Sequence, residues 1–243
     1  MKVKIKVNPY EKDDMLGYAT INFDDKYVYE NVRIKKSKID GSPYIQMPQY
    51  RQKQKDENNF DVLDENGKQV YNYKDVFHPI TSTSREDLYN NIINEYYNAK
   101  DGKREKYKWG TYTMSQSLNI SDVYYNEFTS DKLHGFANVS FGEFALENVK
   151  LRYSDKGEYL DLPKYKTLAR DDNGNVIYEN GTPKLVYKDA FHPITKEAQE
   201  ELLQSVSNAR SNKLANVNRN LQNSQPVDDE ILDLTNKKLD RGR

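Results

Sequence analysis

The sequence of 243 residues contains no cysteine, which excludes disulfides, thiolate metal sites and cysteine nucleophiles. It has only three histidines, so few ligands are available for a transition metal. It also lacks a run of about 18 apolar residues that would predict a membrane span. The first residues read Met-Lys-Val-Lys-Ile-Lys, which is not the pattern of a signal peptide. We therefore expect a cytoplasmic protein without a membrane partner.

An excess of one charge sign is also absent, because 37 basic and 38 acidic residues give a net charge of −1. Any basic binding site must then be a local patch. The apolar content of 36% and the mean hydropathy of −1.01 indicate small cores. Twenty tyrosines stand against one tryptophan. These amphipathic rings can complete thin cores, and they can also serve as stacking surfaces.

One stretch of the chain occurs twice, as residues 74–81 and again as residues 188–195. Both read Lys-Asp-x-Phe-His-Pro-Ile-Thr, and the second follows the first by 114 residues. Further matched pairs are residues 17–23 with 135–141, Glu30-Asn31-Val32 with Glu147-Asn148-Val149, and Met47-Pro48 with Leu162-Pro163. Four motifs in one order, at a nearly constant spacing, indicate two copies of a small domain.

Alternation of apolar and polar residues predicts strands at residues 2–7, 17–23, 27–35 and 44–47 of the first copy. Turns are expected at residues 24–26 and 40–43. The side chains predicted to face inward are Val32, Ile34, Val149 and Leu151, and those predicted to face outward are Arg33, Lys35, Lys150 and Arg152. The polar excursions 49–72 and 164–187 are either hairpins or simple loops.

A helix is predicted to end each copy. Its buried stripes are Leu88, Ile92 and Tyr96 in the first copy, and Ala198, Leu202 and Val206 in the second. The first helix should begin near residues 81–83, with Thr83 and Glu86 as a candidate capping box. The predicted domains are residues 1–98 and 118–210, joined by a basic linker over 99–117. We expect a tail without a fixed fold over 211–243, whose deletion leaves the fold intact.

The order of strand, Asp-Asp turn, Asn-Val strand, Met-Pro, basic loop, His-Pro-Ile and helix resembles the SpoVG family (stage V sporulation protein G, septation regulators). The resemblance covers about residues 2–98 and 118–210. It implies a small antiparallel sheet with a C-terminal helix, dimerisation, and DNA or RNA binding in the bacterial control of septation and sporulation. The expected fold class is therefore α+β: two tandem small antiparallel sheets, each followed by a helix and packed as a pseudo-dimer within one monomer.

The resemblance also implies a nucleic-acid contact in the loop after Met-Pro. That loop reads Gln49-Tyr50-Arg51 in one copy and Lys164-Tyr165-Lys166 in the other. Arg51 and Lys166 fall on the arginine of the family, and a tyrosine replaces its lysine in both copies. The candidate nucleic-acid-binding residues are Arg33, Lys35, Tyr50, Arg51, Lys53, Lys150, Arg152, Lys164, Tyr165 and Lys166. Considered individually, each of these lysines and arginines can also be a surface residue whose role is to keep the protein soluble.

Catalytic and metal-binding interpretations find little support in the residues. A structural role is predicted for His78-Pro79 and His192-Pro193, at a sheet-to-helix turn. Asp24 and Asp25 are adjacent acids in a turn, and the second copy has Gly142 and Glu143 there. Neither a glycine-rich phosphate loop nor a Ser-His-Asp arrangement is present. We expect no enzyme activity, no cofactor and no metal.

Two hypotheses from different classes remain. The first is a DNA- or RNA-binding regulator that contacts phosphates and stacks tyrosines on bases. The second is an interaction module that has lost nucleic-acid binding and docks a protein through its excursions or through the tail at residues 228–234. Reversal of Arg33, Lys35, Lys150 and Arg152 to glutamate weakens nucleic-acid binding only under the first hypothesis.

Overall fold

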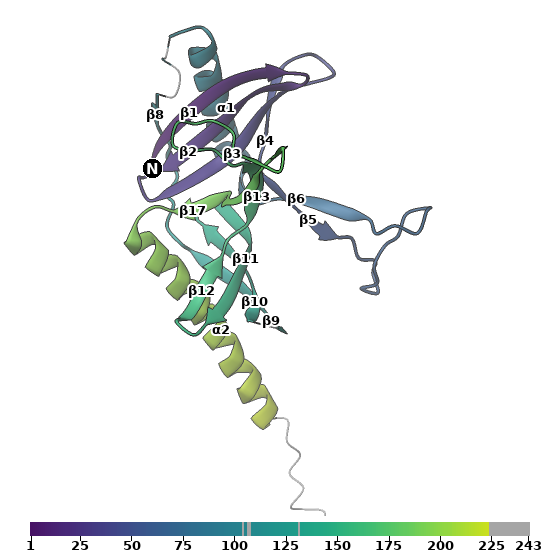
Figure 1. The fold of residues 1–243 in the computed structure, drawn as a ribbon. Coiled ribbons are helices and arrows are strands. Elements are labelled where there is room, and N and C mark those ends of the chain that lie inside the picture. The colour runs from purple at the N-terminus through teal and green to yellow at the C-terminus, as the bar shows by residue number, and fades with distance from the viewer. Residues whose placement is uncertain (104, 106–107, 131, 224–243) are drawn as a thin grey trace, which may run out of the picture.

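The computed structural model describes residues 1–103, 105, 108–130 and 132–223. The architecture is α+β, with mostly antiparallel sheets and one helix after each half of the chain (Figure 1). The helices are α1 (Ser82–Lys100) and α2 (Lys196–Asn223). Neither is long and apolar enough, over its described residues, to cross a membrane.

The first sheet has the strand order β17-β3-β2-β1-β8, and β4 also pairs with β3. These strands are β1 (Lys2–Lys12), β2 (Met15–Phe23), β3 (Tyr27–Lys36), β4 (Pro43–Gln46), β8 (Gly110–Thr113) and β17 (Phe191–Pro193). The alternation in the sequence therefore located β1 to β4 correctly. As predicted, Val32 and Ile34 are fully buried, whereas Arg33 between them is exposed.

The second sheet has the order β12-β11-β10-β9, and β7 pairs with β11. Its strands are β7 (Phe77–Pro79), β9 (Asp122–Ser130), β10 (Leu133–Phe141), β11 (Phe144–Ser154) and β12 (Gly157–Asp161). It repeats the first sheet in the same order, with β9, β10, β11 and β12 in the places of β1, β2, β3 and β4. The duplication read from the sequence is thus a duplication of structure.

Each half supplies one short strand to the sheet of the other half. In β7, Phe77 lies opposite Leu146 of β11. In β17, Phe191 lies opposite Tyr29 of β3. Leu146 and Tyr29 occupy the same position in the two copies, so the exchange is reciprocal and in the same register. The repeated Phe-His-Pro motif is therefore the strand that completes the neighbouring sheet.

The core between the two sheets is aromatic. The rings of Phe77 and Phe191 stack with centroids 4.3 Å apart. Tyr27 stacks on Phe191 at 5.3 Å, and Phe144 stacks on Phe77 at 5.4 Å. All four rings are at most 1% exposed. Because each copy contributes two of these rings, the two halves share one core. Aromatic side chains fill this core in a chain whose apolar content is low.

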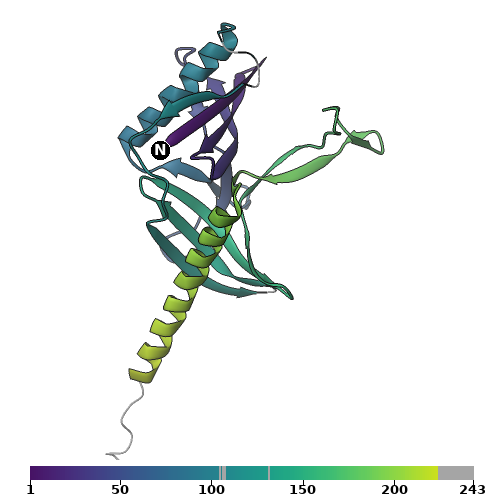
Figure 2. The same ribbon diagram turned by 90° about the vertical axis from the view of Figure 1, so that its left-hand side faces the viewer.

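The two helices bury the stripes that the sequence predicted. Leu88, Ile92 and Tyr96 of α1 are buried, and so are Ala198, Leu202 and Val206 of α2. Figure 2 shows α1 lying along the first sheet and α2 along the second. The N-cap of α1 is Thr81, whose Oγ1 accepts from the Ser84 amide at 3.2 Å, so the helix does not use the Thr83–Glu86 capping box.

The predicted linker over residues 99–117 is partly wrong. Its first two residues belong to α1, and residues 110–113 form β8, which pairs antiparallel with β1. Met114 then follows, fully buried, and its amide donates to the Met1 carbonyl at 2.9 Å. The basic run did not reveal this strand because only Gly-Thr-Tyr-Thr, four residues long, carries it.

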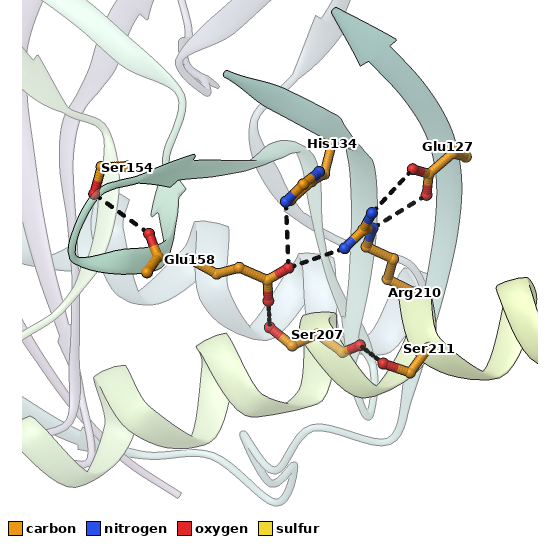
Figure 3. Close-up of polar contacts among 8 residues, drawn as sticks. Glu127, His134, Ser154, Glu158, Ser207, Arg210 and Ser211 are labelled. Carbon is orange, nitrogen blue, oxygen red and sulfur yellow. Dashed lines mark hydrogen bonds and ion pairs between the residues drawn. The ribbon is translucent and has the colours of Figure 1, made fainter. Parts of the chain in front are cut away.

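The predicted tail also needs correction, because α2 continues to Asn223 rather than ending at residue 210. The remaining part of that prediction, residues 224–243, lies outside the described residues. Arg210 shows why the helix persists: its guanidinium pairs with Glu127 of β9 at 3.3 Å and with Glu158 of β12 at 3.1 Å (Figure 3). Lys213, one turn further on, donates to the Tyr125 carbonyl at 2.8 Å. Polar contacts with the second sheet hold this part of α2. An apolar stripe in the sequence cannot predict such contacts, so the sequence did not show that the helix continues.

Both polar excursions are paired hairpins, which decides the alternative that the sequence left open. In the first, β5 (Gln49–Lys53) pairs with β6 (Tyr71–Asp75). In the second, β13 (Lys164–Leu168) pairs with β16 (Leu185–Asp189), and β14 (Tyr178–Glu179) pairs with β15 (Thr182–Pro183) nearer the tip. We call residues 49–75 arm 1 and residues 164–189 arm 2. Arm 1 projects from the body in Figure 1, and arm 2 does so in Figure 2.

Candidate nucleic-acid interface

The tyrosines of the two Met-Pro loops fix the arms to the opposite halves. The Tyr50 hydroxyl donates to Glu147 Oε2 at 2.7 Å. The Tyr165 hydroxyl donates to Glu30 Oε2, also at 2.7 Å. Burial, together with the carboxylate, raises the pKa of both tyrosines above the usual range. Each arm therefore begins beside the outer face of the sheet from the other copy.

Arm 2 and the outer face of the first sheet enclose a cleft of about 720 Å³. The cleft is lined by β1, β2 and β3 on one side and by β13, β16 and Arg170 on the other. Its five basic residues are Lys6, Arg33, Lys166, Arg170 and Lys188, and its one acidic residue is Glu30. We call it the basic cleft. It joins cations from the two copies, although the whole chain is nearly neutral.

A second hollow, of about 620 Å³, adjoins the basic cleft and shares Asn31, Arg33, Tyr165 and Lys166 with it. It lies between the bases of the two arms, and its lining adds Lys164, Tyr73 and Tyr187. The rings of Tyr73 and Tyr187 are 65% and 66% exposed. Exposed rings beside cations form a surface that suits unpaired bases along a phosphate backbone.

Of the residues predicted for nucleic acid, the structure brings Arg33, Lys164, Tyr165 and Lys166 together here. Sequence reasoning missed Lys6, Arg170 and Lys188. Lys6 was visible as an outward residue of the first strand, and Lys188 as part of the repeated motif. Their proximity depends on arm 2 crossing to the first sheet, and the Tyr165–Glu30 bond between the copies shows that crossing.

The comparisons with known proteins agree with this arrangement of two copies. A model of the SpoVG family matches residues 1–98 and again residues 118–211. The chain belongs to the SpoVG family. It is 34% identical over 89 residues to the "Putative septation protein SpoVG" of Borrelia hermsii (strain HS1 / DAH), a match that spans 37% of this chain and 72% of that protein. No solved structure matches the chain.

Most of the remaining predicted cations of this SpoVG chain contact local partners. Lys35 pairs with Asp14 at 2.8 Å, and Lys53 pairs with Asp61 at 2.7 Å. Arg51 lies over the ring of Tyr71 at 4.5 Å. The structure places Lys150 on β11, half-buried and on the outer face. These residues do not line the basic cleft.

Asp161 neutralises a further pair of cations. It accepts from Arg152 at 2.9 Å and also from Lys164. Burial opposes ionisation of Asp161, but the bonds from Lys164 and Arg152 outweigh it and lower the pKa of the carboxyl. Arg33, Lys166 and Lys188, by contrast, form no ion pair within the described part of the chain. All three line the basic cleft.

The two histidines of the SpoVG motif occupy matched positions on the exchanged strands. His78 lies opposite Ala145, and His192 lies opposite Val28. The Nδ1 atom of each is buried without a hydrogen-bond partner among the described residues. No group of three or more potential metal ligands occurs in the described ranges. Their structural role stays a prediction.

Proposed function

We propose that this protein is a regulator of the septation and sporulation type that binds single-stranded nucleic acid in the basic cleft. The observation that carries the proposal is the convergence of Arg33 from one copy with Lys166, Arg170 and Lys188 from the other. Phosphate contacts by such a cluster of cations supply affinity without a cofactor. The printed name of the Borrelia hermsii relative, a septation protein, supports the regulatory part.

Single strands are favoured over duplex because Tyr73 and Tyr187 expose their rings beside the cations. An aromatic ring stacks on a base that is free of its partner, whereas the bases of a duplex are already stacked. Tyr50 and Tyr165, whose hydroxyls are bonded to glutamates, serve in this proposal to orient the arms. Lys35, Arg51, Lys53, Lys150 and Arg152 form a second, weaker contact surface.

The duplication provides a matched test. In the cleft variant, Arg33, Lys166 and Lys188 are each changed to Glu. In the control variant, the residues at the same positions of the other copy, Lys150, Arg51 and Lys74, are each changed to Glu. Both variants change the net charge by the same amount. Any difference between them therefore reports the location of the site, while an equal effect reports charge alone.

Binding is measured by fluorescence anisotropy with labelled 20-mers of single-stranded DNA, single-stranded RNA and duplex DNA, each at two salt concentrations. The cleft variant is expected to lose about 100-fold or more in affinity for single strands, and its salt slope should fall by about 2, since three phosphate contacts at about 0.7 each are lost. The control variant should lose less than tenfold. Equal losses in both variants, or unchanged binding by a folded cleft variant, would sink the proposal.

The stacking surface is tested separately. Tyr187→Ala should weaken binding to single strands by about 1–3 kcal/mol and leave duplex binding nearly unchanged. The exposed Tyr178 of β14, which lines neither the basic cleft nor the adjoining hollow, is the control position. Equal effects of Tyr187→Ala on single strands and duplex would remove the argument for single strands.

A further inference from the structure

The first half of the chain fills a groove that the second half leaves open. β8 pairs with the edge of β1, with Tyr112 opposite Val3 and Gly110 opposite Ile5. It also contacts α1, because the Tyr112 hydroxyl donates to Glu95 Oε2 at 2.6 Å. β8 therefore lies between a sheet edge and a helix, and it covers backbone groups of β1.

In the second half, β9 takes the place of β1 and is the edge strand of its sheet. Tyr125 lies opposite Ala137 as Val7 lies opposite Ala19, so Val123 corresponds to Ile5. A groove of about 630 Å³ runs between β9 and α2 and is lined by residues 120–125 on the strand side. Residues 120–123 of this lining correspond to Lys2–Ile5, the part of β1 that β8 covers. The groove therefore lies where a strand equivalent to β8 would pair with β9, and none of the described residues forms that strand.

The helix side of the groove differs in one position that sets its depth. Ala209 of α2 follows Thr195 by 14 residues, as Glu95 of α1 follows Thr81. A Cβ placed on Gly110 would lie 2.2 Å from the Glu95 carboxylate, so a side chain at that position of the first half would have to displace Glu95. Ala209 lines the groove instead and leaves room for a large side chain. Ile120, Val123 and Val217 make the lining around it apolar.

The edge of β9 is capped by two charged side chains rather than by a strand. The Val123 amide donates to Asp122 Oδ1 at 2.8 Å. The Tyr125 carbonyl accepts from Lys213 Nζ at 2.8 Å. The peptide groups of an incoming strand would replace these bonds. Such caps keep an open edge from pairing at random, and they can rotate away when a suitable strand arrives.

The described residues of this chain do not supply an occupant for the groove. β8 begins ten residues after α1 ends at Lys100. The counterpart of Lys100 in α2 is Leu214, and the helix continues nine residues beyond it, to Asn223. At 1.5 Å per residue this carries the chain about 13 Å past the point where α1 turns back. Up to residue 223, the return path that delivers β8 therefore has no counterpart.

We propose that the groove between β9 and α2 is a strand-acceptor site for an extended, uncharged segment of a partner protein. The segment pairs antiparallel with β9 and places an apolar side chain over Ala209. Main-chain hydrogen bonds supply affinity, and the pocket over Ala209 supplies specificity. Amides of Asn208, Asn212 and Asn216 line the α2 side of the groove and bond polar groups of the segment.

The probe is a fluorescein-labelled peptide with the sequence of residues 108–116 in which Gly110 is replaced by Leu, added to the full chain. The leucine conflicts with the Glu95 carboxylate at the β1 edge, whereas the groove over Ala209 has room for it. Saturable 1:1 binding at micromolar concentration is expected. The same peptide methylated on the Tyr112 nitrogen should bind at least tenfold more weakly, because it cannot pair. Absence of saturable binding, or equal binding of the methylated peptide, would overturn the proposal.

The variant Ala209→Glu restores the arrangement of the first half. It should bind the leucine peptide at least tenfold more weakly than the parent and should prefer the peptide that keeps Gly110. Lys213→Ala, which removes one cap, should strengthen binding several-fold. Circular dichroism checks that both variants fold. An unchanged preference in a folded Ala209→Glu chain would contradict the pocket.

A second copy of the chain and the chain's own C-terminal residues are the competing occupants. Light scattering that shows a dimer dispersed by the peptide would assign the groove to a second copy and overturn the proposal. A full chain carrying Leu232→Asp and Leu234→Asp that binds the peptide at least tenfold more tightly would assign it to the C-terminal residues. Unchanged affinity and a monomeric parent are expected.

Discussion

The two tyrosine–glutamate bonds, Tyr50 with Glu147 and Tyr165 with Glu30, are the residue-scale link between the copies. Each joins the base of an arm to the neighbouring sheet. A phenol that is half-buried and bonded to a carboxylate stays protonated to a higher pH than a free tyrosine. The fold therefore depends on the protonation of these two groups.

Because the pKa of Tyr50 and Tyr165 is raised on folding, the stability that they contribute is complete below the unfolded-state pKa near 10 and is lost as pH rises above it. The double variant Tyr50→Phe, Tyr165→Phe should be less stable at pH 8 by about 1–2 kcal/mol per site. It should also lose less of its remaining stability between pH 10 and pH 11.5. Urea unfolding at each pH measures both effects.

The matched control is Tyr178→Phe, at a position that is 63% exposed. Its stability should follow that of the parent at every pH. Parallel curves for the parent and the double variant would show that the bonds between the copies do not sense pH.

The repeated motifs illustrate how much could be read from residues alone. Asn31 and Asn148 both have a φ of 60°, a left-handed conformation that asparagine tolerates, and both lie at a register shift of the sheet. Gly135 packs so closely on β9 that a Cβ would lie 2.2 Å from the Asn126 carbonyl. The sequence showed that these positions recur. The structural reasons for the recurrence are a β-bulge at the asparagines and a close approach of two strands at the glycine. Both become visible only when the pairing of the strands is known.

At the scale of elements, long alternating or periodic segments were predicted well, and elements that depend on distant partners were not. β8 is too short to carry a pattern, and its position on β1 follows from Tyr112 and Glu95. The end of α2 was missed because polar side chains, rather than an apolar stripe, hold it. The basic cleft was half predicted: Arg33 and Lys166 were identified, but their proximity follows from arm 2 crossing between copies.

The corrected length of α2 changes the expected effect of truncation. A chain ending at residue 210 loses the bonds of Lys213 to Tyr125 and Asn126, as well as three helical turns. Its free energy of unfolding should fall by about 1–3 kcal/mol, which lowers Tm by several degrees. A chain ending at Asn223 keeps every described contact and should match the parent. Scanning calorimetry compares the three chains, and equal Tm values for all of them would show that residues 211–223 contribute nothing.

At the scale of the whole molecule, the exchange of β7 and β17 makes each half depend on the other. A half on its own leaves a Phe-His-Pro strand without a sheet and a sheet without its outer strand. Since Tyr29 and Leu146 occupy the same register, a strand from a second identical half can fill either gap. The fused chain satisfies both gaps internally.

The full chain should therefore be a monomer of 28.5 kDa, whereas residues 1–117 expressed alone should form a homodimer. Phe77→Ala, which removes a fully buried ring from the shared core, should cost about 3–5 kcal/mol in the full chain and dissociate that homodimer. Light scattering measures the masses. A full chain that is a stable dimer at micromolar concentration, or a half that is a folded monomer, would contradict the dependence.

The exchanged strands also determine when, during translation, each sheet can be completed. β3 leaves the ribosome early, but Phe191, which pairs with its Tyr29, follows 162 residues later. At about 5–20 residues per second the edge of β3 waits roughly 10–30 s for its partner. During that interval a nascent chain on a neighbouring ribosome presents an identical Phe-His-Pro strand at residues 77–79. Adjacent ribosomes on one message thus favour entangled chains, and spacing between them favours the closed monomer.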